Sequence, residues 1–250
     1  MKKIAEVTLL FWVMKICATT LGETAGDLLA QTLHVGYGTS SLILIGIFLV
    51  VLLAQLTVNR YIPALYWAVI LATSTAGTTM SDYMDRTLGL GYATGALILV
   101  SILAVVLGVW WLSEKSLSVS NITTRRGELF YWTAILFSNT LGTALGDYLA
   151  DDSGLGFGGG ALLIGSLLAV VVLAYYFTSL SRVLLFWVAF VLTRPFGATF
   201  GDLLTKAPDK HGLGFGTQGS SLILFLILAV LVGYSSLKSN PNQLAESGAN

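Results

Sequence analysis

The chain has 250 residues, equal numbers of acidic and basic residues and a mean hydropathy of +0.81. Hydrophobic residues make up 55% of it and charged residues only 10%, whereas soluble domains carry about 25% charged residues. This composition excludes a soluble globular domain and gives no basic surface for nucleic acid. The single cysteine, Cys17, excludes an intrachain disulfide and a thiolate metal site.

The amino end could be mistaken for a secretory signal peptide, because Lys2 and Lys3 precede an apolar run. Lys15 interrupts that run, and the same segment pattern returns three times later in the chain. We therefore interpret it as the first of several membrane helices. The apolar runs of about 18 to 20 residues in this chain have the length that a helix needs to cross a bilayer.

One short pattern occurs four times and defines the architecture. It consists of a glycine, three variable residues, a second small residue and an aspartate. The four copies are Gly22 to Asp27, Gly77 to Asp82, Gly142 to Asp147 and Gly197 to Asp202. Fifteen residues before each aspartate stands a tryptophan that follows another aromatic residue: Trp12, Trp67, Trp132 and Trp187.

Each repeat predicts two helices joined by a glycine-rich link. The first helices are expected over 7–29, 62–84, 127–149 and 182–204. The second helices are expected over 40–57, 94–113, 160–177 and 219–236. The predicted fold is all-α and integral to the membrane, with eight transmembrane helices from four parallel repeats. The four polar first helices are expected inside and the four apolar second helices outside.

These repeats form a single predicted transmembrane domain, residues 1–237, with repeat boundaries at 5–58, 60–113, 125–178 and 180–237. Residues 114–128 are expected to be a cytoplasmic connection between two halves, and residues 238–250 a disordered tail. Most basic residues lie at the ends of the chain or between repeats, which predicts cytoplasmic termini. Parallel repeats imply a pseudo-symmetry axis along the membrane normal, either fourfold or a two-fold of pairs.

The first helices carry a polar stripe. Counting back from each aspartate in steps of three or four keeps to one helix face. The stripe contains the candidate pathway-lining residues Thr20, Thr24, Thr75, Thr78, Thr79, Asn139, Thr140, Thr143 and Thr199. The small residues of the repeated pattern predict close helix packing, and the tryptophans predict an interfacial aromatic belt. Pro195 predicts a kink in the seventh helix.

The four aspartates carry the main functional hypothesis, because a charge inside a bilayer is costly unless it is paired or hydrated. A rise of 1.5 Å per residue places each aspartate roughly 22 Å beyond its tryptophan, in the outer third of the bilayer. One interpretation is a clamp in which each carboxylate accepts backbone N–H bonds from its glycine-rich link. The other is an acidic cluster near the axis, formed by Asp27, Asp82, Asp147 and Asp202.

Three charged residues break the fourfold pattern. Glu23 lies one turn before Asp27, and two carboxylates at this spacing repel unless a cation or proton intervenes. Lys15 and Arg194 are the other two. They either neutralise nearby acids, or act as tethered cations that compete with a transported ion.

The repeated Trp and Gly-x-x-x-Gly-Asp pattern resembles a family of bacterial membrane proteins built from four tandem two-helix repeats of unknown function. The resemblance covers residues 5–237, and only Ser81 departs from the second glycine. It implies a bacterial inner-membrane protein and no particular activity.

From the residues themselves, we expect a transporter of a small cation such as Mn²⁺ or Mg²⁺, with proton coupling left open. The metal or proton would bind at Glu23, Asp27, Asp82, Asp147 and Asp202, because oxygen ligands suit hard ions. Lys15 and Arg194 would tune the charge. An ion channel with an acidic selectivity ring and a non-transporting scaffold or sensor are the alternatives. No enzymatic activity, cofactor or nucleic-acid partner is expected; the partners are lipid and the cation, and a homo-oligomer is left open.

Overall fold

The computed structural model describes residues 3–119, 122 and 124–247, with side chains as far as Leu237. This part of the chain forms eight α-helices and no strand. The first helices of the repeats are α1 (Leu9–Asp27), α3 (Pro63–Asp82), α5 (Arg125–Asp147) and α7 (Arg182–Thr205). The second helices are α2 (Tyr37–Thr57), α4 (Tyr92–Glu114), α6 (Gly156–Phe177) and α8 (Thr217–Ser247). All eight predicted helices are thus confirmed.

Polar residues mark where the first helices begin. The hydroxyl of Thr8 accepts a hydrogen bond from the Phe11 N–H at the start of α1, and Thr124 caps α5 in the same way. Pro63 opens α3, a position where the missing N–H costs nothing. Three second helices follow a glycine with positive φ: Gly36 at 82°, Gly91 at 73° and Gly216 at 72°. Glycine adopts this conformation without steric penalty, so the chain can reverse there.

Each of the first three repeats contains a π-helical turn immediately after its aspartate. These turns are η1 (Leu28–Thr32), η2 (Tyr83–Thr87) and η4 (Tyr148–Asp152). The fourth repeat differs, because α7 continues to Thr205 and a short 3₁₀ helix, η5 (Pro208–Lys210), follows. Short π segments are rare and often lie at functional sites.

Helices α1, α3, α5 and α7 form a closed ring, in which each packs against two of the others. The glycines of the repeated pattern make this packing close. A Cβ added at Gly22 would lie 2.3 Å from Ser74 Cβ, and one at Gly197 would lie 2.5 Å from Thr19 Oγ1. Small residues therefore bring neighbouring helices together around the ring, as their spacing predicted.

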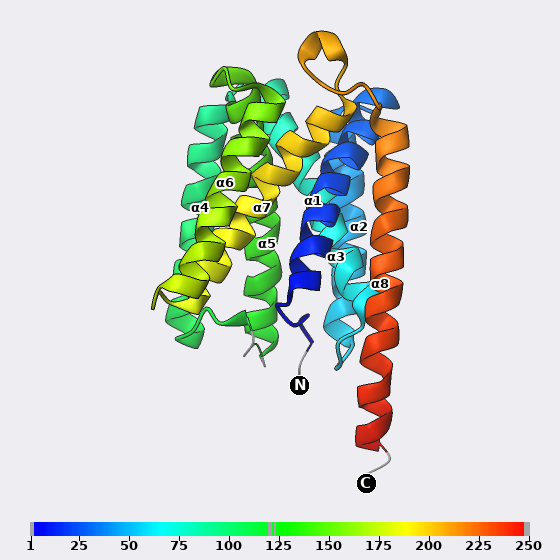
Figure 1. The fold of residues 1–250 in the computed structure, drawn as a ribbon, viewed down its shortest axis with the longest axis vertical. Coiled ribbons are helices and arrows are strands. Elements are labelled where there is room, and N and C mark those ends of the chain that lie inside the picture. Colours follow the sequence, from blue (N-terminus) through cyan, green and yellow to red (C-terminus); the bar gives the residue numbers. More distant parts are fainter. Residues whose placement is uncertain (1–2, 120–121, 123, 248–250) are drawn as a thin grey trace.

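Every second helix packs against the first helix of the following repeat. Helix α2 lies against α3, α4 against α5 and α6 against α7, and α8 returns to α1. Both chain ends lie at one end of the bundle, and the links within the repeats lie at the other (Figure 1). Pro195 lies inside α7, which remains a continuous helix and runs obliquely across the bundle (Figure 1).

Two predicted boundaries differ from the structure. The connection expected over 114–128 is shorter, because the Thr124 cap starts α5 at Arg125. The tail expected to be disordered from residue 238 continues α8 as far as Ser247, since extending an existing helix costs little; residues 248–250 lie outside the described part.

Five of the described helices are long and apolar enough to cross a membrane: α2, α4, α6, α7 and residues 217–237 of α8. The chain is therefore a helical membrane protein with internal repeats. Helices α1, α3 and α5 do not meet this criterion. They carry most of the polar stripe, whose side chains are buried inside the protein.

Candidate cation site

The four aspartates of the repeated pattern lie together at one end of the ring. They occupy the ends of α1, α3 and α5 and the last turn of α7, and each is only 2–3% exposed. We call Asp27, Asp82, Asp147 and Asp202 the acidic layer. The parallel arrangement of the repeats brings them to one level, as in the acidic-cluster interpretation, which was one of the two that the sequence left open.

Two cations connect the acidic layer in pairs. Lys206 Nζ lies 2.6 Å from Asp27 Oδ2 and 3.1 Å from Asp202 Oδ1. Arg86 lies 2.8 Å from Asp82 Oδ1 through Nε and 3.2 Å from Asp147 Oδ2 through a terminal nitrogen. Each cation therefore joins its own repeat to a neighbouring one. None of the described backbone N–H groups of the glycine-rich links donates to these aspartates, so the proposed hairpin clamp is not what holds them.

This pairing follows a two-fold axis. Arg86 and Lys206 each lie four residues after the aspartate of an even-numbered repeat, whereas the equivalent positions in the odd-numbered repeats hold Gln31 and Asp151. Gln31 donates a hydrogen bond to Asp27 at 2.5 Å. Of the two symmetries that the sequence left open, the ion pairs therefore obey the two-fold of repeat pairs.

The sequence analysis did not identify Arg86 or Lys206 as candidate site residues. Their side chains are 32% and 19% exposed, so they cover the acidic layer from the link end of the bundle. Burial lowers the pKa of the Lys206 ammonium, but the carboxylates of Asp202 and Asp27 outweigh it and raise that pKa above its ordinary value. The spacing of four residues between acid and base on a helix was the available signal.

Glu23 lies close to two members of the acidic layer. One carboxylate oxygen from each of Glu23, Asp147 and Asp202 can be chosen so that all three lie within 4.8 Å of one another. All three residues are buried and come from three different repeats. Three carboxylates at this separation can surround a hard cation, which prefers oxygen ligands. Asp27 and Asp82 lie outside this triad and are held by Lys206 and Arg86.

The charges around this triad do not cancel. Five buried carboxylates, those of Glu23 and the acidic layer, are contacted by three cations: Arg86, Arg194 and Lys206. With all of these groups ionised, two negative charges remain uncompensated. A divalent cation would balance them, and so would two protons.

Arg194 crosses the centre of the ring, where its residue is 0% exposed. One terminal nitrogen lies 3.0 Å from Glu23 Oε2 and donates to the hydroxyls of Thr78 and Thr143 at 2.5 and 2.7 Å. The other terminal nitrogen donates to the Thr19 carbonyl at 3.5 Å. Arg194 thus contacts all three other repeats, and it forms an ion pair with Glu23, which is the first of the two roles that the sequence left open for it.

Lys15 behaves differently from Arg194, although both break the repeat pattern. It is 0% exposed, donates to Asn139 Oδ1 at 3.2 Å and lies 4.0 Å from the centre of the Phe190 ring. Asn139 in turn donates to the hydroxyl of Thr73 at 2.9 Å. No carboxylate among the described residues forms an ion pair with Lys15.

The candidate pathway residues divide into two groups. The hydroxyls of Thr78 and Thr143 accept hydrogen bonds from Arg194, and Asn139 accepts one from Lys15. These three side chains therefore face the ring centre. Thr24 instead bonds to Ser221 of α8 at 2.9 Å, and a Cβ added at Gly160 of α6 would lie 3.0 Å from Thr199 Cγ2. A residue three positions before an aspartate lies about 100° around the helix from a residue four positions before it. Thr24 and Thr199 therefore point toward second helices.

The remaining candidate hydroxyls are buried but bond to carbonyls of their own helix, so the structure gives them no direct contact with the charged groups. They are Thr20, Thr75, Thr79 and Thr140.

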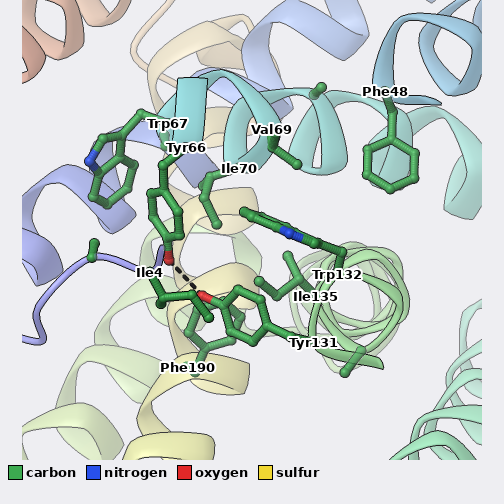
Figure 2. Packing of buried hydrophobic residues seen from close by; sticks show 14 of the residues in the cluster. Ile4, Phe48, Tyr66, Trp67, Val69, Ile70, Tyr131, Trp132, Ile135 and Phe190 are labelled. Carbon is green, nitrogen blue, oxygen red and sulfur yellow. Dashed lines mark hydrogen bonds between the residues drawn. The ribbon is translucent and has the colours of Figure 1, made fainter. Parts of the chain in front are cut away.

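The opposite end of the same four helices is aromatic. Trp67, Trp132 and Trp187 are 2%, 0% and 6% exposed, so these three do not form the predicted interfacial belt, whereas Trp12 is partly exposed. They pack with their preceding aromatic residues inside the ring, and the Tyr66 and Tyr131 hydroxyls lie 2.5 Å apart (Figure 2). The belt prediction failed because Trp67 and Trp132 pack against neighbouring first helices, and Trp187 packs against Trp110 of α4 and donates to the Leu117 carbonyl.

The four repeats each match the family model described as Repeat of Unknown Function (DUF347), at residues 10–61, 65–116, 130–181 and 185–239. The chain belongs to this repeat family. No curated protein and no solved structure gives a significant match. Membership confirms the tandem-repeat architecture that the Trp and Gly-x-x-x-Gly-Asp pattern suggested, and it leaves the activity to be inferred from the site.

Proposed function

We propose that the protein crosses a bacterial inner membrane eight times, with α2, α4, α6 and α8 against lipid. The exposed side chains of these four helices are predominantly apolar, which suits hydrocarbon. The basic residues between repeats favour cytoplasmic termini, and the acidic layer then lies near the outer face. Reporter fusions at the two chain ends and in the 206–216 link test this orientation.

Within this arrangement, the protein is a transporter of a small hard cation such as Mn²⁺ or Mg²⁺. The observation that carries this proposal is the buried carboxylate triad of Glu23, Asp147 and Asp202. The two uncompensated negative charges favour a divalent ion or proton exchange over a neutral substrate. Asp27 and Asp82 would contribute through Lys206 and Arg86, whose partly exposed side chains stand between the acidic layer and the outer face.

The position of Arg194 favours a transporter over a channel with an acidic selectivity ring. Its guanidinium occupies the centre of the ring on the inner side of the triad, and the aromatic residues close the far end. A continuous pore would require both to move, whereas alternating access requires such closures.

Thermal stability of the purified protein across a panel of ions tests the proposal. A ligand that binds only the folded state raises the unfolding temperature by mass action. Mn²⁺ or Mg²⁺ is expected to stabilise the wild type, and Glu23→Gln, Asp27→Asn and Asp147→Asn are expected to lose that response. Asp209→Asn, which changes an exposed carboxylate in the link, is the matched control and should respond as wild type.

The same measurement can also contradict the cation proposal. If no ion shifts the wild type while the acidic variants melt at lower temperature, the carboxylates are structural. The protein would then be a scaffold or sensor, and the cation proposal would be withdrawn.

A further inference from the structure

One terminal nitrogen of Arg194 is surrounded by oxygen atoms. It lies 2.5 Å from Thr78 Oγ1, 2.7 Å from Thr143 Oγ1, 3.0 Å from Glu23 Oε2 and 3.4 Å from the Ser74 carbonyl. Residues Thr78, Thr143 and Ser74 are 0% exposed and Glu23 is 3% exposed. A buried shell of one carboxylate, two hydroxyls and one carbonyl matches the oxygen donors that proteins offer to hard cations.

The repeats explain how this shell is built. Glu23, Thr78 and Thr143 each lie four residues before the aspartate of their repeat, so the closed ring brings them to one level. In the fourth repeat the equivalent residue is Ala198, which offers no donor, and Arg194 lies one turn earlier on the same helix. Three repeats thus supply oxygen atoms, and the fourth supplies a cation.

We propose that this shell is a second cation site, which the Arg194 nitrogen occupies in place of a transported ion. The proposal rests on the proposed function and adds an inner site to it. Glu23 belongs both to this shell and to the triad with Asp147 and Asp202. An ion at the triad and the Arg194 guanidinium therefore compete for Glu23, and an ion reaches the inner site only when Arg194 withdraws.

A purely structural role for Arg194 makes the opposite prediction. A buried arginine that only ties four helices together leaves an uncompensated acid when it is removed, and stability is lost with nothing gained. An arginine that occupies a cation site leaves a vacant site, so its removal creates ion affinity. The sign of the change in ion binding separates the two roles.

The test is Mn²⁺ binding to the purified protein, measured by equilibrium dialysis with spectroscopic counting of free Mn²⁺. Arg194→Gln is expected to bind Mn²⁺ at least about tenfold more tightly than wild type, because a like charge beside Glu23 is gone. Arg194→Lys keeps a tethered cation and is expected to remain close to wild type. If Arg194→Gln binds no more tightly, the inner site is refuted.

Removing a positive charge would also strengthen binding at the triad alone, so the two hydroxyls decide between the sites. Adding Thr78→Val and Thr143→Val to Arg194→Gln is expected to abolish the gain. A gain that survives the loss of both hydroxyls overturns the inner site.

These measurements also separate the inner site from the proposed function. If the wild type binds Mn²⁺ and Asp147→Asn abolishes that binding, the triad is supported, whatever the Mn²⁺ affinity of Arg194→Gln. If Arg194→Gln binds Mn²⁺ through the two hydroxyls and the wild type binds none, the result supports the inner site and counts against the triad. Should Arg194→Gln purify unfolded, Mn²⁺ present throughout purification is expected to restore its thermal transition, and no restoration counts against the inner site.

Discussion

The two ends of the ring are built from the same four helices and the same repeated pattern, yet they are organised differently. At the aromatic end, residues of one kind pack face to edge, and neighbouring repeats make similar contacts. At the acidic end, four equivalent aspartates are divided into two pairs by Arg86 and Lys206. Apolar side chains can pack in a similar way in all four repeats. Four buried like charges instead require counter-charges, and residues that supply them make the repeats unequal.

The comparison is tested most strongly at the aromatic end, where packing should dominate stability. Trp132 is fully buried, with ring centres 5.0 Å from Tyr131 and 5.4 Å from Tyr66. Trp132→Ala is expected to lower the free energy of unfolding by about 3 to 5 kcal/mol, because it leaves a large cavity. Chemical denaturation in detergent measures this. Trp111→Ala, at a side chain that is 51% exposed, should have a much smaller effect, and equal effects would contradict a buried aromatic end.

At the acidic end, the loss of stability caused by removing a cation should depend on pH. Lys206→Met leaves Asp27 and Asp202 without their shared cation, and breaking a buried ion pair costs about 3 to 5 kcal/mol. The raised pKa of Lys206 keeps the ammonium charged at neutral pH, so its stabilisation is present at pH 7 and is lost only in strong alkali. The deficit of Lys206→Met should shrink at acidic pH, where the freed aspartates protonate. Lys206→Arg is the control; a deficit independent of pH would argue against the ion pairs.

A third test uses Asp85, a buried acid that only the second repeat has at this position. Burial raises its pKa to about 6, partly opposed by a hydrogen bond from Ser81 and by Arg86. The neutral form is therefore favoured in the fold, and its stabilisation is present below pH 3.8 and lost as pH rises through about 6. Asp85→Asn should remove up to about 3 kcal/mol of this pH dependence. Thermal scans of both proteins between pH 4 and 7 measure it, and parallel curves would refute it.

The smallest expected effect is at the hydrogen bond between Tyr66 and Tyr131. Tyr66→Phe should cost about 1 kcal/mol, the usual net value of one hydrogen bond. The double change with Tyr131→Phe should cost less than the sum of the single changes, because both remove the same bond. Additive effects would show that the two hydroxyls act independently.

Much of the fold could be predicted from the sequence, because its determinants are local and repeated. The helices, the close approach at glycines such as Gly22 and the gathering of the aspartates all follow from one pattern and its period. The division of the aspartates into pairs could not be assigned, because it depends on which residue follows each aspartate and on which neighbour that residue reaches.

Two errors have the same physical origin. The tryptophans were assigned to a lipid interface, and Thr24 and Thr199 to the ring centre, because helical spacing gives the relative direction of side chains but not the absolute rotation of the helix. The π-helical turns such as Tyr83–Thr87 had no recognisable sequence pattern. Contacts between repeats set the rotation of each helix, on which the first two features depend.

The packing of each second helix on the following repeat means that no repeat encloses its own core. A fragment cut from the ring would leave one first helix without cover and one second helix without a surface to lie on. Solenoid repeats can unravel from their ends, but here α8 lies against α1, so the first and last segments stabilise each other. The four repeats should therefore unfold as one cooperative unit. Two half-length chains divided in the connection between Glu114 and Arg125 should be stable only as a complementing pair.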